Sequence, residues 1–382
     1  MNFKPLFRRS LNAAPGRLHM AAHSHHLWPD ASYDGQVECW NDAARLADRK
    51  WDRIMGEVWP EAQAHVANEL GSGDPSAIVF AGNTHDLLIR LAAACPRRDG
   101  EPLRILTSDG EFHSARRQFA RWEESDGAAV TRLPVGPELP GELIAQASGH
   151  DLIFVSQLMF GTGTPIAVDR LAALGRANGP WVVIDGYHSF MALARPFPMP
   201  LGETAYFVSG GYKYAMAGEG CAFMHCPPGF GPRPPLTGWY AEFDERDLPP
   251  GHVGYAPDAM RFMGATFDAS GLYRFNAVQR MLAAEGLSTA TISDRIDGLQ
   301  AQLLDAIAGT PLGQADLLNP LDGRAHARFL AFRSPRAAGW CEQLHREGCI
   351  TDVRGDVLRI GLGLYHDEAD VAAFAALAQC LR

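Results

Sequence analysis

The chain has 382 residues, of which 47% are hydrophobic and 20% are charged. This composition excludes fibrous and disordered proteins, and the length allows two domains that share a large core. Because the net charge of -10 at pH 7 repels phosphates and anionic membrane surfaces, we expect a small-molecule substrate, with neither a nucleic acid nor a membrane as partner.

The cysteines and the N-terminus bear on the cellular compartment. Seven cysteines are spread singly along the chain, without a C-x-x-C pair. This pattern favours reduced thiols over a disulfide framework or a structural zinc site. The N-terminal stretch MNFKPLFRRSLNAAPG lacks an apolar segment of signal-peptide length, and no run of 18 apolar residues occurs. We therefore expect a cytoplasmic protein.

Three histidines, His23, His25 and His26, lie close together near the N-terminus. No carboxylate or cysteine stands at a matched spacing, so we predict no metal site here. The alternative is that this segment forms one wall of an active site.

Short apolar runs then alternate with segments of helical character. Helix patterns cover Asp86–Ala94 and Asp169–Ala177. The alternation predicts an α/β domain with a mostly parallel sheet, roughly between residues 60 and 260. The runs typical of buried strands are Ala77–Phe80, Leu103–Leu106, Leu152–Val155, Trp181–Ile184, Ala205–Val208 and Cys221–Met224.

The last third of the chain is rich in helix patterns. We predict helices over Leu272–Ala284 and Thr291–Ala308, and strands over Arg328–Phe332 and Val357–Ile360. These elements indicate a second, smaller α+β domain. The predicted division is an N-terminal segment of residues 1–60, a large domain of residues 61–265 and a small C-terminal domain of residues 266–382.

Two ionisable residues follow neighbouring strands of the predicted sheet. Asp185 comes directly after the apolar run Trp181–Ile184, and Lys213 follows the next strand, 28 residues later. An unpaired buried carboxylate is costly, so Asp185 needs a cationic partner. Because sheets of this kind bind ligands beyond the carboxyl ends of their strands, we expect the two groups to share a site.

A third strand end adds an anion site. The run Ala77–Phe80 leads into Asn83 and Thr84 at the start of a helix, where the backbone N–H groups attract a phosphate. A plain helix cap is the alternative. A lysine amine for a Schiff base, a carboxylate for the ring nitrogen and a phosphate cup together suit pyridoxal phosphate.

The same residues carry a family resemblance. The order Asp-x-x-His from Asp185, followed by S-G-G-Y-K-Y around Lys213, resembles the class V aminotransferase group of fold type I pyridoxal phosphate enzymes. Within that group the chain is most similar to kynureninases. His23–Pro29 resembles their N-S-H-G-L segment, SQLMFGTG at 156–163 is similar to S-H-V-N-Y-x-T-G, and GCITDVRGDVLRIGLGLYHDEADV resembles their C-terminal order of D-x-R, a hydrophobic residue with arginine, L-Y and D-V.

The resemblance implies a fold type I architecture and a set of cofactor contacts. Lys213 would form the Schiff base and move the Cα proton, Asp185 would pair with the pyridine nitrogen, and His188 would lie near the phenolic oxygen. The remaining implied contacts are the phosphate ligands Asn83, Thr84 and Tyr212, the stacking ring Phe112, and two residues near the subunit boundary, Trp239 and Thr266. For His188 and Phe112 an ordinary core position is the alternative.

The resemblance also implies a substrate side and an assembly. Arg359 would bind the α-carboxylate of an amino acid, because a planar guanidinium matches that group. His25 and Tyr240 are the other predicted substrate contacts. A homodimer with shared active sites is implied as well.

The expected reaction is kynureninase-like hydrolysis of the Cβ–Cγ bond of kynurenine or a related β-substituted amino acid. Several positions depart from that pattern: Met159 replaces an asparagine, and Tyr240 begins a segment that replaces W-G-H. A class V aminotransferase, or a β-eliminating lyase of cysteine desulfurase type using Cys349, is the alternative. A non-catalytic protein that keeps the fold is a third possibility, disfavoured by the retained Lys213, Asp185 and Arg359.

Overall fold

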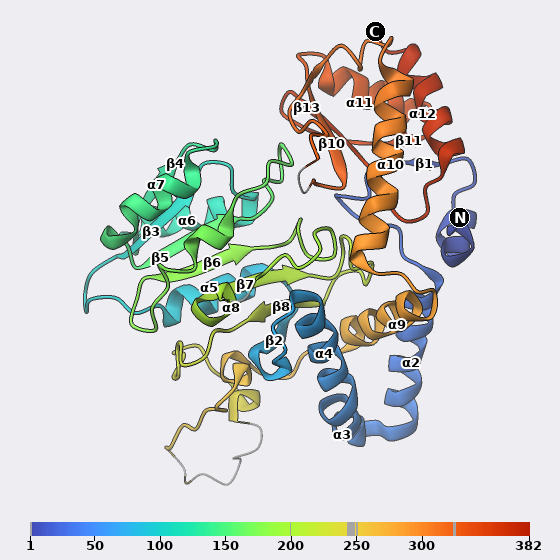
Figure 1. Cartoon of the computed structure of the whole chain (residues 1–382). Coiled ribbons are helices and arrows are strands. Elements are labelled where there is room, and N and C mark those ends of the chain that lie inside the picture. The colour runs from blue at the N-terminus through green and yellow to red at the C-terminus, as the bar shows by residue number, and fades with distance from the viewer. Residues whose placement is uncertain (1, 199, 243–248, 250, 324–325) are drawn as a thin grey trace.

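The protein is described by a computed structural model that covers residues 2–198, 200–242, 249, 251–323 and 326–382. A large mixed sheet and a small sheet form two parts of the molecule, and a long helix, α10 (Thr289–Ile307), runs alongside the small sheet (Figure 1). Both chain termini lie near the small sheet.

The central sheet has seven strands in the order β2-β8-β7-β6-β5-β3-β4. β8 is antiparallel to both neighbours, and the other strands run parallel, which confirms the mostly parallel sheet. All six predicted strands are present. Their bounds are β2 (Ile78–Ala81), β3 (Leu103–Ser108), β5 (Leu152–Ser156), β6 (Trp181–Asp185), β7 (Ala205–Gly210) and β8 (Ala222–His225).

The seventh strand, β4 (Ala128–Leu133), was not predicted. It lies at the edge of the sheet, and its middle residues are exposed or half-buried. An edge strand does not need the continuous apolar run that marks a strand buried on both faces.

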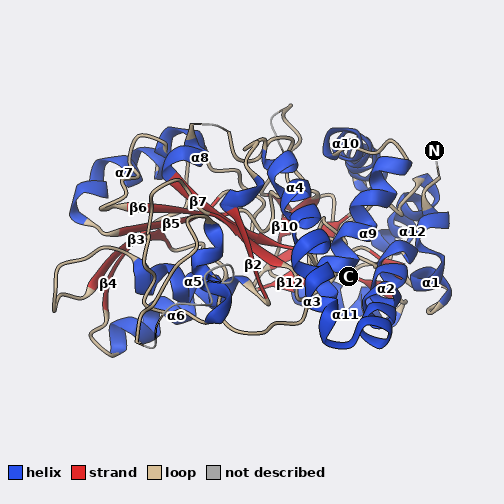
Figure 2. Ribbon diagram, turned by 90° about the horizontal axis from the view of Figure 1, so that it is seen from below, coloured by secondary structure: helices blue, strands red, loops and turns tan. Residues whose placement is uncertain are grey.

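Helices cover both faces of this sheet. Figure 2 shows α7 (Leu139–Gln146) and α8 (Leu201–Thr204) on one side and α5 (Thr84–Ala94) and α6 (His113–Glu124) on the other. The predicted helix over Asp86–Ala94 is confirmed as α5. These layers leave the carboxyl ends of the parallel strands open at one edge of the sheet.

The predicted helix over Asp169–Ala177 is wrong. Only a 3₁₀ turn, Val168–Leu171, forms there. The backbone at Gly175 lies so close to the Thr204 carbonyl that a Cβ atom would overlap it, and the Thr204 hydroxyl donates to the Ala172 carbonyl at 2.8 Å. The segment before β7 therefore occupies the Ala172 carbonyl, which would accept a backbone hydrogen bond in a continuing helix.

The small sheet has the order β12-β13-β10-β9 and is antiparallel throughout. Its strands are β9 (Asp316–Leu317), β10 (Phe329–Arg333), β12 (Asp352–Arg354) and β13 (Val357–Gly361), and α11 (Ala337–Arg346) and α12 (Glu368–Gln379) accompany it. The predicted strands at β10 and β13 are confirmed. Both predicted helices are confirmed as well, as α9 (Ser270–Ala284) and α10.

The N-terminal segment is attached to the small sheet. β1 (Leu18–His19) pairs in parallel with β11 (Cys349–Ile350), and Ala21 forms a bridge to Gly361 at the end of β13. This pairing carries the histidine cluster from the N-terminus to the edge of the small sheet, which faces the large one.

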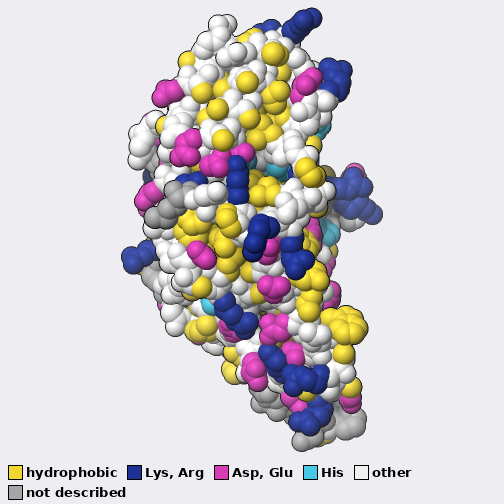
Figure 3. Space-filling model, turned by 90° about the vertical axis from the view of Figure 1, so that its right-hand side faces the viewer, with side chains coloured by type: hydrophobic (Ala, Val, Ile, Leu, Met, Phe, Trp, Pro, Cys, Tyr) yellow, Lys and Arg dark blue, Asp and Glu magenta, His cyan; other side chains and the backbone are white. Residues whose placement is uncertain are grey.

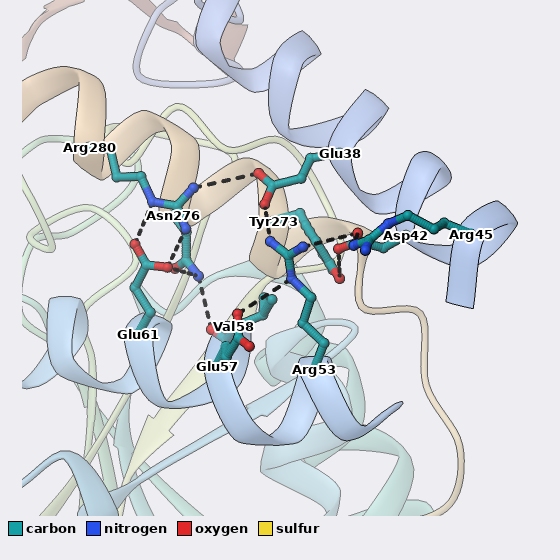
Figure 4. A network of polar contacts seen from close by, with 10 residues as sticks. All are labelled: Glu38, Asp42, Arg45, Arg53, Glu57, Val58, Glu61, Tyr273, Asn276 and Arg280. Atoms are coloured by element: carbon teal, nitrogen blue, oxygen red, sulfur yellow. Dashed lines mark hydrogen bonds and ion pairs between the residues drawn. The ribbon is translucent and has the colours of Figure 1, made fainter. Parts of the chain in front are cut away.

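A polar network joins the remaining N-terminal helices to α9 (Figure 4). Arg53 contacts Glu38 at 2.7 Å and Asp42 at 3.0 Å, and Asp42 also accepts from the Tyr273 hydroxyl at 3.0 Å. Arg280 of α9 forms an ion pair with Glu61. The helices joined in this way are α2 (Asp30–Leu46), α3 (Lys50–Arg53), the π-helical turn Ile54–Val58, α4 (Trp59–Leu70) and α9.

Short elements complete the described chain. They are α1 (Arg8–Asn12) and the 3₁₀ helices Lys4–Phe7, Ala47–Arg49, Pro75–Ala77, Ala147–Gly149, Trp239–Glu242 and Ala259–Phe262. On the face shown in Figure 3, acidic and basic side chains are mixed, with small hydrophobic areas between them. Within the described ranges, no helix has both the length and the apolar character that crossing a membrane requires.

Candidate active site

Three strands end at one place on the open edge of the central sheet. Ser156 closes β5 and pairs with Asp185, which closes β6, and Asp185 pairs in turn with Val208 of β7. The chain beyond β7 then brings Lys213 back over this edge. Its amine nitrogen Nζ lies 2.6 Å from Nε2 of His188. The structure therefore brings together the three predicted catalytic residues Lys213, Asp185 and His188.

Lys213 is almost completely buried, with 5% of its surface exposed. Its Nζ lies 4.9 Å from the ring centre of Tyr187, 5.7 Å from that of Tyr212 and 5.8 Å from that of Phe112. Burial lowers the pKa of Lys213 to about 7, although the charge of Asp185 acts in the opposite direction. At neutral pH a large share of this amine is uncharged and able to act as a nucleophile or base.

Asp185, His188 and Lys213 all line one small pocket, which we call the inner pocket. Burial raises the pKa of Asp185, while the backbone N–H of Tyr187, which donates at 2.9 Å, and the charge of Lys213 lower it. Among the described residues, no arginine or lysine forms an ion pair with this carboxyl group within 4 Å. The carboxyl group is therefore able to pair directly with a cationic group of a ligand.

Two buried histidines lie on the side of Lys213 that faces the small sheet. His188 Nδ1 and both ring nitrogens of His23 have no hydrogen-bond partner among the described residues. The His23 ring stacks on Phe329 of β10 at 4.7 Å, and the His188 ring lies 5.7 Å from the same ring. Burial, followed by the charges of neighbouring cations, holds the pKa of both histidines well below the usual value. Both are neutral polar groups with free hydrogen-bonding capacity.

The predicted anion site lies at the start of α5. Asn83 is the N-cap: its Oδ1 accepts from the backbone N–H of Asp86 at 2.9 Å, and its Nδ2 donates to the Asp86 carboxylate at 3.0 Å. The capping alternative for Asn83 is thus observed, and it is compatible with anion binding by the backbone of the first turn. Thr84 lines the pocket that also contains Lys213 and Asp185.

The pocket opens outward into a wide cleft of about 1130 Å³. Thr84, Phe112, Tyr187 and Tyr212 line both the inner pocket and the cleft. A ligand that extends from Asp185 toward the N-terminus of α5 therefore passes Phe112 and Tyr212 on its way out. Phe112 presents its ring at the pocket and is not enclosed in the core.

Arg359 is buried on the substrate side, with 2% of its surface exposed. Its Nη2 and Nε contact Oδ1 of Asp352 at 2.8 and 3.3 Å, and its Nη1 donates to the backbone carbonyl of Phe160. Burial lowers the pKa of Arg359. The guanidinium lies near the site, but its N–H groups already bind Asp352 and the Phe160 carbonyl. To bind a substrate carboxylate, it must give up these contacts or share them with the substrate.

The structure separates four other predicted residues from Lys213. His25 is exposed and stacks on the outer side of Tyr212 at 5.1 Å. Tyr240 is buried against the rings of Trp51 and Phe267 and does not line the pocket in this chain. The two residues predicted at a subunit boundary, Trp239 and Thr266, are exposed.

Sequence reasoning missed three residues that the structure brings to this site. Tyr187 and Ser156 line the inner pocket, and Glu111 lies buried directly behind Ser156. Ser156 ends β5, and Tyr187 follows two residues after the end of β6. Their position at the strand ends is the sequence signal that could have identified them. Glu111 gives no such signal, because it lies in a loop.

The cysteines do not contribute to the pocket. All seven are unpaired, and none lines the inner pocket or the cleft. Burial raises the pKa of the Cys349 thiol to about 12, so this group is not a reactive thiolate. Within the described ranges, no cluster of three or more histidine, cysteine or acidic side chains could hold a metal ion.

The chain was compared with family models, with curated proteins and with solved structures, and the solved structures agree on its architecture. No family model matches the chain. The isopenicillin N epimerase of Amycolatopsis lactamdurans is 27% identical over 213 residues, so the match spans about half of either chain. A cysteine desulfurase from Thermococcus onnurineus NA1 superposes with a TM-score of 0.80 at 16% identity, covering 98% of this chain and 97% of that one.

Two further solved structures are similar over almost their whole length. The cystine C-S lyase C-DES, solved with its product cysteine persulfide, has a TM-score of 0.78 at 16% identity and covers 96% of this chain and 99% of its own. The cysteine desulfurase CsdA from Escherichia coli has a TM-score of 0.79 at 16% identity and covers 100% and 98%. At this identity the likeness establishes the fold, which is that of fold type I enzymes of cysteine desulfurase type.

Proposed function

We propose that this chain is a pyridoxal phosphate enzyme that acts on an amino acid. The observation that carries the proposal is the buried amine of Lys213 at the ends of β6 and β7, close enough to the Asp185 carboxyl group for the two charges to interact, although Asp185 forms no ion pair within 4 Å among the described residues. The fold and the partial likeness to an epimerase support it. Another of the similar structures is described with a pyridoxal phosphate cofactor, which is in keeping with this assignment.

The residues of the pocket fit this cofactor. The partnerless Nδ1 of His188 and the lone carboxyl of Asp185 are polar groups that a ligand with a protonated ring and a phenolic oxygen would satisfy. The N–H groups at the start of α5, with Thr84 and Tyr212, would hold the phosphate at the cleft. Phe112 would cover one face of the ring.

Bound pyridoxal phosphate supplies an electron sink that weakens the bonds at the Cα atom of an amino acid. Lys213 would provide the amine that attaches the group and would then take and return the proton at Cα, since its pKa of about 7 leaves about half of the amine uncharged at neutral pH. His188, in contact with Nζ, orients that amine. Asp185 holds positive charge at the inner end of the pocket.

The substrate side is assigned to the small sheet and the N-terminal segment. Arg359 would bind the α-carboxylate, with Asp352 keeping the guanidinium oriented. His25 is proposed as a further substrate contact, and Trp239 and Thr266 as residues that complete a site of the second subunit in a homodimer. Tyr240 is not proposed as a substrate contact, because its ring is buried against Trp51 and Phe267. The exposure of His25, Trp239 and Thr266 is compatible with contacts made across subunits.

For the reaction we propose kynureninase-like hydrolysis of the Cβ–Cγ bond of kynurenine or a related amino acid. The aromatic surroundings of Arg359 support this choice. Phe160 and Phe329 lie 5.8 and 5.6 Å from its guanidinium carbon, and Phe160 contacts the ring of Phe112 at 5.4 Å. Such a wall suits a substrate with an aromatic side chain.

A β-eliminating lyase is the second candidate. The similarity of fold to a cystine C-S lyase favours it. A desulfurase that needs a reactive cysteine is disfavoured, because Cys349 is buried with a raised pKa and no cysteine lines the pocket.

Absorbance and product analysis test the proposal. The purified protein with added pyridoxal phosphate is expected to develop a visible absorption band and to release alanine from kynurenine or 3-hydroxykynurenine. Release of pyruvate with sulfide or cysteine persulfide from cystine would select the lyase, and consumption of a second keto acid would select an aminotransferase. A protein that gains no visible band would overturn the cofactor assignment.

A further inference from the structure

Glu111 is a fully buried carboxyl group just outside the residues proposed to hold the cofactor. It lies in the loop between β3 and α6, directly before Phe112, with 0% of its surface exposed. Its Oε1 accepts from the Ser108 hydroxyl at 2.5 Å, and its Oε2 accepts from the backbone N–H and the hydroxyl of Ser156 at 3.0 and 2.5 Å. Among the described residues, no basic side chain forms an ion pair with it. Three donors, and no cation, surround this carboxyl.

One residue separates Glu111 from the proposed cofactor site. Ser156 and Asp185 are partners in the parallel register of β5 and β6, and both line the pocket that contains Lys213. The hydroxyl that Glu111 binds therefore belongs to the wall of that pocket. The same loop carries Phe112, so Glu111 ties the covering ring to the end of β5.

We propose that Glu111 is a positioning residue of this site, which fixes Phe112 relative to Ser156 and acts through its charge on Asp185 and on the ring bound there. The proposal rests on the proposed function. Glu111 touches neither the substrate nor the cofactor, and its effect passes through Ser156 and the electric field.

The charges around Glu111 make the coupling specific. Burial, and to a smaller extent the charge of Asp185, raise the pKa of Glu111, the three donors lower it, and the net pKa is about 7. The charge of Lys213 acts on Asp185 in the opposite sense and lowers its pKa. Of the other ionisable groups on the loop and on α6, Asp109 accepts from the Val135 backbone at 3.1 Å and His113 is exposed. When a cation neutralises Asp185, the repulsion on Glu111 falls and Glu111 ionises more readily.

The charge of Glu111 has a measurable consequence in the protein without cofactor. An acid whose pKa is higher in the folded than in the unfolded state binds more protons when folded, so stability falls as pH rises from the unfolded value toward about 7. Glu111→Gln keeps the size of the side chain and removes the charge. Relative to this variant, the wild type is expected to lose a few degrees of melting temperature between pH 5 and pH 8. Equal pH profiles would contradict a buried, titrating Glu111.

The loaded protein tests the action on the cofactor. In a pH titration of the visible absorbance, Glu111→Gln is expected to lower the midpoint by about half to one pH unit, because a negative charge that favours the protonated chromophore is removed. Glu111→Ala is expected to give the same shift and also to weaken cofactor binding about tenfold, since the tie between Phe112 and Ser156 is lost. The matched control is Glu142→Gln, at an exposed glutamate of α7 that lines neither the pocket nor the cleft, and it is expected to leave both values unchanged.

The two proposals fail in different ways. A wild type that gains no visible band overturns the cofactor assignment, and the melting profiles without cofactor still decide whether Glu111 titrates. A wild type that binds the cofactor, together with a Glu111→Gln midpoint identical to it, overturns the role of Glu111 alone. Equal loss of cofactor affinity in the Gln and Ala variants would contradict the expected difference between them, because Gln keeps the size of Glu111, and would overturn the positioning of Phe112 by the packing of this side chain.

Discussion

The cofactor side and the substrate side of the candidate site differ in how their polar groups are satisfied. On the large sheet, Asp185 forms no ion pair within 4 Å and His188 has a ring nitrogen without a hydrogen-bond partner, among the described residues. On the small sheet, Arg359 is already held by Asp352 and by the carbonyl of Phe160. A buried polar group without a partner costs free energy unless a ligand supplies the partner. The large sheet is therefore arranged for a ligand that stays bound. On the small sheet, Arg359 must instead give up one of its contacts within the chain each time a substrate binds.

The largest effect is expected for Lys213→Ala on the cofactor side. Among the described residues Lys213 is the only lysine that lines the pocket, so its loss removes both the covalent attachment and the base. Turnover is expected to fall by at least roughly 1000-fold, and the visible band of the attached cofactor is expected to disappear. Lys50→Ala, at a half-buried lysine beside Trp51, is the control and keeps both. A variant at position 213 with normal absorbance and turnover would break the comparison at its cofactor end.

The next effect is expected for Asp185→Asn. The amide keeps the shape but cannot balance a cation, so turnover is expected to fall about 100- to 1000-fold while the fold is retained. Steady-state kinetics and circular dichroism measure the two parts. If turnover stayed within about threefold of the wild type, the carboxylate would not be holding charge at the ring.

A smaller effect is expected on the substrate side. Arg359→Lys keeps the charge and loses the planar fork, so KM is expected to rise about 10- to 100-fold, with a smaller change in kcat. Arg354→Lys is the matched control, because Arg354 also contacts Asp352, at 3.1 Å, but is exposed. A normal KM in Arg359→Lys would mean that the carboxylate binds elsewhere.

The pH dependence of cofactor capture gives the smallest predicted effect. Only the uncharged amine attacks a carbonyl, and the pKa of Lys213 lies at about 7. The rate of appearance of the visible band is therefore expected to fall about tenfold from pH 8 to pH 6 and to level off above pH 8. Stopped-flow absorbance measures it, and a rate that keeps rising steeply to pH 10 would indicate an ordinary, solvated lysine.

The sequence allowed the cofactor side to be predicted better than the substrate side, for physical reasons. Asp185 and Lys213 follow buried apolar strands, so their neighbourhood follows from the parallel register of the sheet. Arg359 was placed correctly near the site, but its contact with the Phe160 backbone depends on the tertiary approach of a loop 199 residues away in sequence. Local pattern carries no information on such contacts.

The errors have the same origin. The segment 169–177 has a helical pattern, but the close approach of Gly175 to Thr204 prevents the helix. Glu111 is a polar residue whose burial arises only when distant elements meet, at Ser156. By contrast, the six apolar strands were predicted because a strand that is buried on both faces has a nearly continuous run of apolar residues in its sequence.

The most direct test of the central claim is reductive trapping of the cofactor followed by peptide mapping. The chain contains three lysines, Lys4, Lys50 and Lys213, so a borohydride-reduced adduct has few possible positions. The account predicts one equivalent of pyridoxyl group, located on the peptide that contains Lys213, with Lys4 and Lys50 unmodified. An adduct on Lys4 or Lys50 alone, or the absence of any adduct from protein incubated with pyridoxal phosphate, would contradict it.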